Sequence, residues 1–252
     1  VKRFIQPIFS EDAEGRKKAI SSSFIQAKTD GVTHLDLGDD VWAKCLFDNS
    51  AKKMTEILKS LHQEFAPDIT FLPQLGISRH CSIDYIKEWL EPFLDLDYYQ
   101  TIDLSGDEFA QPIQAFKPIY RMAKKAGLVL KAHIGEWGDA DSVKEAVVEL
   151  ELDEIQHGIS AAESSSVMNW LADHNIQLNI CPTSNVMLSR VESLECHPIR
   201  RLYDHGIRVT INTDDMLVFN QSVSDEFMNL YDEGLFTAEE LNQIRLYGLE
   251  TY

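Results

Sequence analysis

The sequence is short of basic residues. Its 252 residues include 23 lysines and arginines against 41 aspartates and glutamates, which gives a formal net charge of −18. Proteins that bind nucleic acids through phosphate contacts usually present a basic patch. We therefore expect no nucleic-acid partner, and we interpret the acidic surface as one that serves solubility.

Cysteines and long hydrophobic runs are also scarce. The four cysteines, Cys45, Cys81, Cys181 and Cys196, show neither C-x-x-C spacing nor a dense framework, which indicates free thiols in a reducing compartment. No apolar run approaches the roughly 20 residues of a membrane-spanning helix, and the first residues do not resemble a signal peptide. We expect a cytoplasmic protein with no membrane partner. Because the chain starts without methionine, we also expect that residues precede Val1.

Short β-branched or apolar runs alternate with amphipathic segments along the chain. The runs predict seven strands, near residues 32–38, 69–76, 98–104, 128–132, 153–156, 177–180 and 208–212. The segments between them predict helices over 11–29, 54–65, 83–93, 112–125 and 197–205, and helices that start at capping boxes at Ser142, Ser160 and Thr237. Strands separated by helices favour a parallel sheet with right-handed crossovers. We predict an α/β fold, a single (β/α)8 TIM-type barrel domain over residues 1–252, with the first strand missing from this chain.

Polar residues stand at the ends of three of the predicted strands. His133 and Glu136 follow the fourth, His157 ends the fifth, and Asp214 and Asp215 follow the seventh. In a parallel barrel the active site is built at these strand ends. Two imidazoles and three carboxylates can hold a divalent metal and carry out acid–base chemistry beside it.

Each of these residues also has a plainer interpretation. A single histidine such as His133 is more often a satisfied, partly buried side chain than a ligand, and Glu136 alone would be a solvated loop carboxylate. An Asp-Asp pair usually marks a turn or a helix start. We interpret Cys181-Pro182-Thr183-Ser184-Asn185 as a strand terminator that bonds to local backbone, and His197-Pro198 as a helix start. His62, His80, His174 and His205 are expected at the surface.

Six short motifs together resemble the adenosine deaminase family of the metal-dependent amidohydrolase superfamily, over about residues 30–247. They are Asp103-Leu104-Ser105-Gly106-Asp107-Glu108, His133-Ile134-Gly135-Glu136, Gln156-His157-Gly158, Cys181-Pro182-Thr183-Ser184-Asn185, His197-Pro198 and Asn212-Thr213-Asp214-Asp215. The resemblance implies a zinc-dependent enzyme that hydrolytically deaminates adenosine or a related 6-aminopurine, releasing ammonia and giving the 6-oxo purine.

The resemblance also implies a role for six residues. His133 and Asp214 would be ligands of the one zinc ion, and Glu136 would be the acid that protonates N1 of the purine. His157 would orient the water and help to deprotonate it. Asp215 would hydrogen-bond N7, and the backbone N–H of Gly106 would meet N3.

One departure from the family pattern keeps a second interpretation open. The family carries a His-x-His pair of metal ligands on its first barrel strand, and no such pair occurs in this sequence. The nearest histidine, His34, belongs to the next strand and is a poor substitute. The alternative is therefore a catalytically impaired, deaminase-like protein that binds a purine or a protein partner and has an incomplete metal site.

Overall fold

The computed structural model describes residues 12–250 of the chain. These residues form one seven-stranded sheet in which every neighbouring pair of strands is parallel and the order follows the sequence. The strands are β1 (His34–Asp40), β2 (Thr70–Ser78), β3 (Thr101–Ser105), β4 (Val129–Ile134), β5 (Glu154–His157), β6 (Gln177–Ile180) and β7 (Arg208–Ile211). All seven predicted strands are present, with ends that differ by a few residues.

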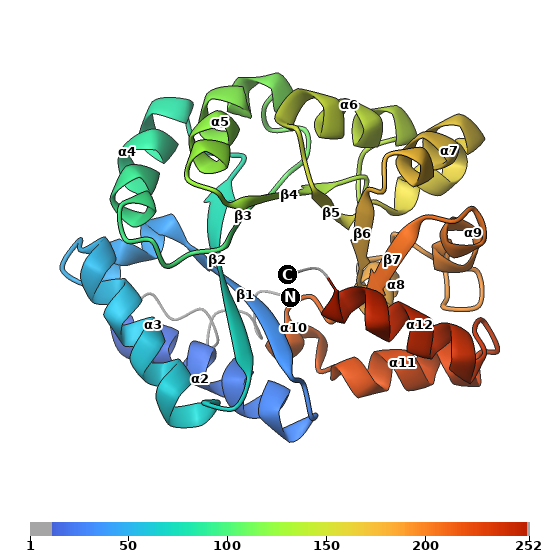
Figure 1. Cartoon of the computed structure of the whole chain (residues 1–252), viewed down its shortest axis with the longest axis horizontal. Coiled ribbons are helices and arrows are strands. Elements are labelled where there is room, and N and C mark those ends of the chain that lie inside the picture. Colours follow the sequence, from blue (N-terminus) through green and yellow to red (C-terminus); the bar gives the residue numbers. More distant parts are fainter. Residues whose placement is uncertain (1–11, 251–252) are drawn as a thin grey trace.

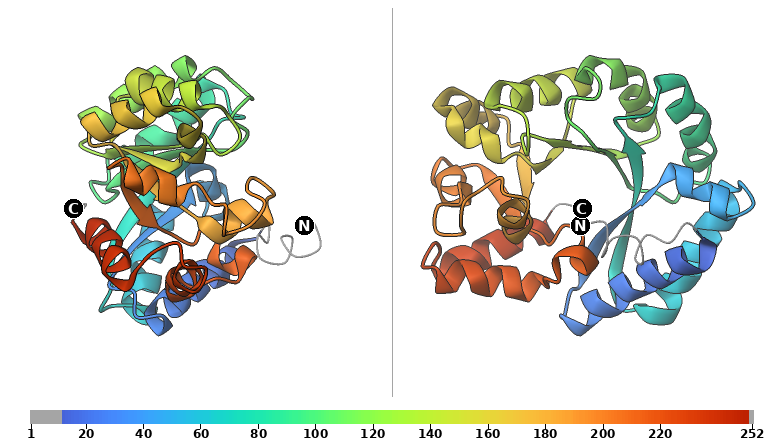
Figure 2. Two further views of the ribbon diagram at one scale, coloured as in Figure 1. Left: turned by 90° about the vertical axis from the view of Figure 1, so that its right-hand side faces the viewer. Right: turned by 180° about the vertical axis from the view of Figure 1, so that it is seen from behind.

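Helices surround the outer side of this sheet. Figure 1 shows the strands as an inner arc and the helices as an outer one, and the opposite view in Figure 2 shows the same arrangement. Helix α2 (Ala13–Thr29) precedes β1. Between the strands lie α3 (Ala51–Phe65), α4 (Ile83–Leu94), α5 (Lys117–Lys125), α6 (Ala140–Leu150), α7 (Ser165–Asp173), α8 (Pro182–Met187) and α9 (Ile199–Asp204). After β7 come α10 (Met216–Phe219), α11 (Val223–Asp232) and α12 (Ala238–Leu249). This is the arrangement of a partial (β/α)8 barrel, with β1 and β7 at the two edges of the sheet.

Three short 3₁₀ helices complete the connections: η1 (Val41–Leu46), η2 (Ile113–Phe116) and η3 (Ile159–Glu163). The predicted helix over 112–125 is therefore split into η2 and α5, with a proline in the first turn of α5. Within residues 12–250, no helix combines the length and the apolar composition needed to cross a membrane.

The helix starts depend on which side chain reaches the free backbone N–H groups of the first turn. Thr237 caps α12 in the predicted capping box. The expected start at Ser142 is wrong, because Asp139 accepts the backbone N–H of Ser142 and α6 begins at Ala140. The expected start at Ser160 is also wrong, because Ser164 caps α7 and Ser160 lies inside η3.

The concave side of the sheet holds a buried ionic cluster. Lys131 of β4 places Nζ 2.5 Å from Asp36 Oδ2 on β1 and 2.9 Å from Glu154 Oε2 on β5. Glu154 Oε2 also accepts a hydrogen bond from Asn179 Nδ2 of β6, at 2.7 Å. Side chains two residues apart share a face of a strand, so His133 projects from the same face of β4 as Lys131, one step nearer the strand end.

Candidate active site

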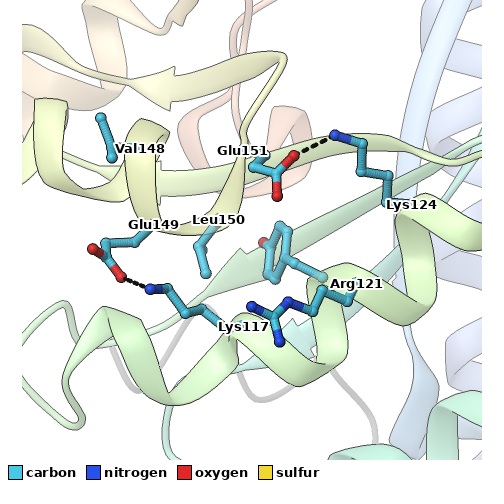
Figure 3. A pocket seen from close by; sticks show the side chains of 8 residues that line it. Lys117, Arg121, Lys124, Val148, Glu149, Leu150 and Glu151 are labelled. Atoms are coloured by element: carbon cyan, nitrogen blue, oxygen red, sulfur yellow. Dashed lines mark hydrogen bonds and ion pairs between the residues drawn. The ribbon is translucent and has the colours of Figure 1, made fainter.

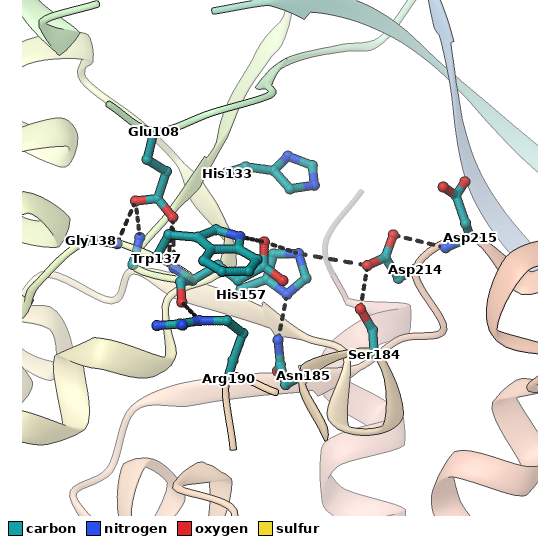
Figure 4. A network of polar contacts seen from close by, with 12 residues as sticks. Glu108, His133, Trp137, Gly138, His157, Ser184, Asn185, Arg190, Asp214 and Asp215 are labelled. Atoms are coloured by element: carbon teal, nitrogen blue, oxygen red, sulfur yellow. Dashed lines mark hydrogen bonds and ion pairs between the residues drawn. The ribbon is translucent and has the colours of Figure 1, made fainter. Parts of the chain in front are cut away.

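The polar residues predicted at the strand ends meet at the C-terminal ends of the strands, as Figure 4 shows. His133 lies near the end of β4, and His157 is the last residue of β5. The centroids of these two imidazole rings are 5.2 Å apart. His157 Nε2 lies 3.8 Å from Glu136 Oε2 and 3.9 Å from Asp214 Oδ2. Residues from three separate strand ends therefore share one small volume.

Gly106 and Asp215 also lie at the C-terminal ends of the strands. Gly106 follows β3 with a φ of +98°, and a Cβ atom there would lie 3.3 Å from the His80 ring, so only glycine fits without strain. Asp215 follows Asp214 directly and is solvent-accessible. Its pKa is raised to about 6 by desolvation of the carboxyl group and by the charge of Asp214, partly offset by His133.

Two of the site residues have left-handed backbone conformations. The φ angle is +65° at His157 and +56° at Asp214. Such angles are uncommon for residues other than glycine and cost on the order of 1–3 kcal/mol, and they cluster at functional sites. The fold thus holds both side chains in directions that an ordinary strand end would not give them.

Asp103 fixes the orientation of the His133 ring. Its carboxylate oxygens lie 3.0 and 3.2 Å from His133 Nδ1. Burial lowers the pKa of His133, but the adjacent Asp103 carboxylate outweighs this effect, and the pKa rises to about 9. A carboxylate on one ring nitrogen is the usual support of a metal-binding histidine, and it leaves Nε2 of His133 available.

Glu136 has one bonded and one unbonded carboxylate oxygen. Oε2 accepts a hydrogen bond from the indole Nε1 of Trp137 at 3.0 Å, whereas the buried Oε1 has no partner within residues 12–250. Burial and the charge of Asp214 raise the pKa of Glu136, while His133 and Trp137 lower it. A carboxyl group with a raised pKa can deliver a proton near neutral pH.

The loop that carries Glu136 is held by a single carboxylate. Glu108 accepts four backbone N–H groups: Gly135 at 2.8 Å and Gly138 at 3.3 Å on Oε2, and Glu136 at 2.9 Å and Trp137 at 2.7 Å on Oε1. A Cβ atom at Gly135 would lie 2.4 Å from Val143 Cγ2. The glycines therefore let the loop pack closely while Glu108 satisfies its donors (Figure 4).

The segment 181–185 contacts the site, which its interpretation as a purely local strand terminator did not predict. Ser184 Oγ donates to Asp214 Oδ2 at 2.6 Å, and the Asn185 side-chain amide lies 3.1 Å from His157 Nδ1. His197, expected at a helix start, is buried, and its ring contacts Asn185. Helix α9 begins two residues later, at Ile199.

The residues present fit a divalent metal. A ligand atom from each of His157, Cys181 and Asp214 lies within 4.8 Å of the others, and the Asp103-supported ring of His133 stands beside them. Burial keeps the pKa of the Cys181 thiol well above its usual range, so thiolate ligation there is disfavoured. An imidazole and a carboxylate are donors that zinc accepts. His34 is no candidate metal ligand, because it is the first residue of β1 and so lies at the opposite end of the strands from His133 and His157.

A cavity lies on the outer side of the sheet, away from the strand ends. About 120 Å³ in size, it lies between α5 and α6 on the outer side of the sheet, and Figure 3 shows its ion pairs Lys117–Glu149 and Lys124–Glu151. These pairs make it a surface groove closed by opposite charges rather than a place for the chemistry of the strand ends.

Several residues that shape the site were not predicted from the sequence. Asp103 and Glu108 belong to a motif quoted above, but only Gly106 was given a role there. Arg190 also escaped prediction: its Nε donates to the backbone oxygen of Glu136 at 2.8 Å, and its guanidinium lies 4.3 Å from the Trp137 ring centroid. No local pattern announces it, because its contacts are made across 54 residues of sequence.

The chain is similar to proteins named as adenosine or adenine deaminases. A sequence model described as Adenosine deaminase matches residues 93–251. A protein of Treponema pallidum with the provisional name adenosine/adenine deaminase is 36% identical over 226 residues, which cover 88% of this chain and 76% of that protein. The adenosine deaminase of Aliivibrio fischeri is 38% identical over 149 residues, 59% of this chain.

A solved structure matches nearly the whole chain. The adenine deaminase of Arthrobacter aurescens superposes with a TM-score of 0.86 at 26% identity, covering 95% of this chain and 74% of that one. The chain spans about half the length of several curated adenosine deaminases, 45% in the case of Aliivibrio fischeri.

Proposed function

This chain belongs to the adenosine deaminase family, and from that premise we propose that it hydrolytically deaminates a 6-aminopurine, either adenosine or a related compound. The purine would take up water at C6 and lose its amino group as ammonia. The product would be the corresponding 6-oxo purine.

One observation carries the proposal: carboxylate oxygens of Glu136 and Asp214, from two other strand ends, lie 3.8 and 3.9 Å from His157 Nε2. A module that only bound purines would have no need to hold two carboxylates around a buried imidazole. Such a cluster suits a reaction in which protons move at two places at once.

We assign the acid to Glu136. Its raised pKa and its bare Oε1 atom suit a group that delivers a proton to N1 of the purine ring as C6 is attacked. His157 would hold the attacking water through Nε2. The backbone N–H of Gly106 and the carboxyl group of Asp215 would bind N3 and N7, and so set which face of the ring meets the water.

His133 and Asp214 would hold the metal, which we take to be zinc. When bound, such an ion lowers the pKa of a water molecule towards ~7 and so supplies a nucleophile at neutral pH. Asp103 would keep His133 Nε2 directed at the ion, and Ser184 would hold Asp214 by its hydrogen bond.

The names of the relatives support a purine substrate but differ in its size. One is named for adenosine and adenine, another for adenosine, and the superposed structure for adenine. The substrate panel should therefore contain both the nucleoside and the free base.

The test is loss of the ultraviolet band of adenosine or adenine on mixing with the purified chain and zinc. Turnover should fall by about 10²–10⁴-fold in Glu136→Gln, because the amide cannot deliver the proton. Glu163→Gln is a matched control, since Glu163 is exposed and lies outside the cluster, and it should keep full turnover.

Two results would contradict the proposal. Full turnover by Glu136→Gln would remove Glu136 as the acid. A wild-type chain that binds zinc yet deaminates neither compound would favour the binding-only alternative.

A further inference from the structure

A chain of hydrogen bonds connects His157, through Asn185 and His197, to the backbone N–H of Ile199, on the side of His157 that faces away from the site. Asn185 on α8 places its side-chain Nδ2 3.1 Å from His157 Nδ1 and its Oδ1 3.3 Å from His197 Nε2. The backbone N–H of Ile199 then donates to His197 Nδ1 at 3.1 Å. Asn185 is fully buried, and His157 and His197 are 2% and 3% exposed. Figure 4 shows the contact between Asn185 and His157.

The polarity of this chain of hydrogen bonds follows from its far end. A backbone N–H can only donate, so His197 Nδ1 must accept, and a neutral His197 carries its proton on Nε2. That proton requires an oxygen, which places Oδ1 of Asn185 towards His197 and its amide nitrogen towards His157. Nδ1 of His157 therefore accepts, and its own proton lies on Nε2.

Burial, and then the neighbouring His157, lower the pKa of His197 to about 3, so its ring is neutral. A reversed chain of hydrogen bonds would set an imidazole N–H against the N–H of Ile199, leaving a buried donor unsatisfied at a cost of about 1–3 kcal/mol.

We infer that Asn185 and His197 are positioning residues that fix His157 in the tautomer with its proton on Nε2, directed at Glu136 and Asp214. The catalytic meaning of this inference rests on the proposed deamination, whereas the tautomer itself does not. Neither Asn185 nor His197 reaches the reacting atoms; they act through His157.

The tautomer divides the two tasks that the family resemblance gives to His157. An Nε2–H group can donate a hydrogen bond to the attacking water and hold its oxygen in place. It cannot also receive the proton of that water at Nε2. The acceptor must then be a carboxylate that faces the same nitrogen: Asp214 at 3.9 Å, or Glu136 at 3.8 Å after it has delivered its own proton to N1.

The test is ¹⁵N nuclear magnetic resonance of the whole chain labelled at histidine, recorded before and after adding zinc. The His157 signals are identified by their loss in His157→Gln. We expect a protonated Nε2 and an unprotonated Nδ1 in the wild type. Protonation at Nδ1, or loss of the Nε2 proton on adding zinc, would overturn the inference, and this measurement requires no positioning variant to fold.

Asn185→Asp provides the converse test. A carboxylate in this place accepts from both rings, so the proton of His157 should move to Nδ1. A folded Asn185→Asp chain in which the proton stays on Nε2 would contradict the inference. His174→Gln, at an exposed histidine, should leave the His157 signals unchanged.

Kinetics separates this inference from the proposed function. In an active chain, Asn185→Asp should lower kcat by about 10–100-fold, as loss of a supporting group does, while KM changes by less than about threefold. A chain with the expected tautomer but no deamination would refute the proposed function alone. An active chain with the opposite tautomer would refute this inference alone.

Discussion

The clamp formed by Glu108 gives the sharpest prediction about how the site is built. Replacing Glu108 with glutamine keeps the size of the side chain but removes its charge and one of its two acceptor oxygens. In the wild type each oxygen takes two backbone N–H groups of the loop 135–138. In Glu108→Gln, two of these donors would instead face an amide NH₂ group.

The magnitude follows from the number of bonds lost. Hydrogen bonds to charged groups contribute about 1.5–3 kcal/mol each, and a buried unsatisfied donor costs about as much. Two such losses give roughly 3–6 kcal/mol, and relaxation of the loop towards solvent lowers this figure. We therefore expect Glu108→Gln to reduce the free energy of unfolding by about 3 kcal/mol, and turnover by about 10²-fold because Glu136 shifts.

The assays are urea denaturation followed by circular dichroism, and steady-state deamination at a temperature where the variant remains folded. Glu145→Gln is a suitable control, since Glu145 is exposed and accepts a hydrogen bond from the exposed Gln114 side chain at 2.5 Å. If Glu108→Gln lost less than about 1 kcal/mol and kept full turnover, the four contacts would not shape the loop.

Three further predictions concern protonation. Trp137→Phe removes the indole donor to Glu136, so the pKa of Glu136 should rise and the alkaline loss of kcat should move to higher pH in a pH–rate profile. Burial raises the pKa of Glu226 to about 7 from 4.5. The stability that Glu226 contributes is therefore fully present below pH ~4.5 and is lost as pH rises through ~7, a decrease of about 3 kcal/mol in the free energy of unfolding. In Glu226→Gln, the free energy of unfolding from urea denaturation should differ less between pH 5 and pH 7.5 than in the wild type. Because the pKa of His133 is about 9 without metal, its proton must leave on binding; zinc affinity measured by competition should rise about tenfold from pH 7 to 8 and weaken in His133→Asn.

Local sequence patterns were sufficient to predict the strands. Most of the strands are short, largely buried runs, and β6 is buried throughout, whereas the polar strand β1 is mostly half-buried or exposed. The helix α11 was not predicted, although Ser222 and Asp225 form a capping box at its start. Its third position holds aspartate rather than the glutamate or glutamine of the usual signature, so the local signal was weaker than the packing that forms the helix.

The gathering of the candidate residues was predictable where it depends on residue type at a strand end, and not where it depends on contacts between distant segments. His133 and His157 lie at the C-terminal ends of β4 and β5, and Asp214 follows β7, so a parallel sheet must bring them together at the same end of the strands. Ser184 and Asn185 follow a strand as well, but hydroxyls and amides at such places usually bond to local backbone. Their partners lie 30 and 28 residues away in sequence, a relation that only the folded chain reveals.

The buried cluster around Lys131 has a consequence for the shape of the site. Asp36 and Lys131 belong to strands that are separated by two others, so their contact spans the curled sheet as a chord spans an arc. The length of this contact therefore helps to set how strongly the sheet curls between β1 and β4, and His133 lies only two residues after Lys131. Removing the ammonium group, as in Lys131→Met, would leave Asp36 and Glu154 as like charges without their shared cation, and the arc would widen. The ion pair between Lys131 and Asp36 thus sets the width of the opening at the C-terminal strand ends, although the pair itself lies two residues before His133 along β4.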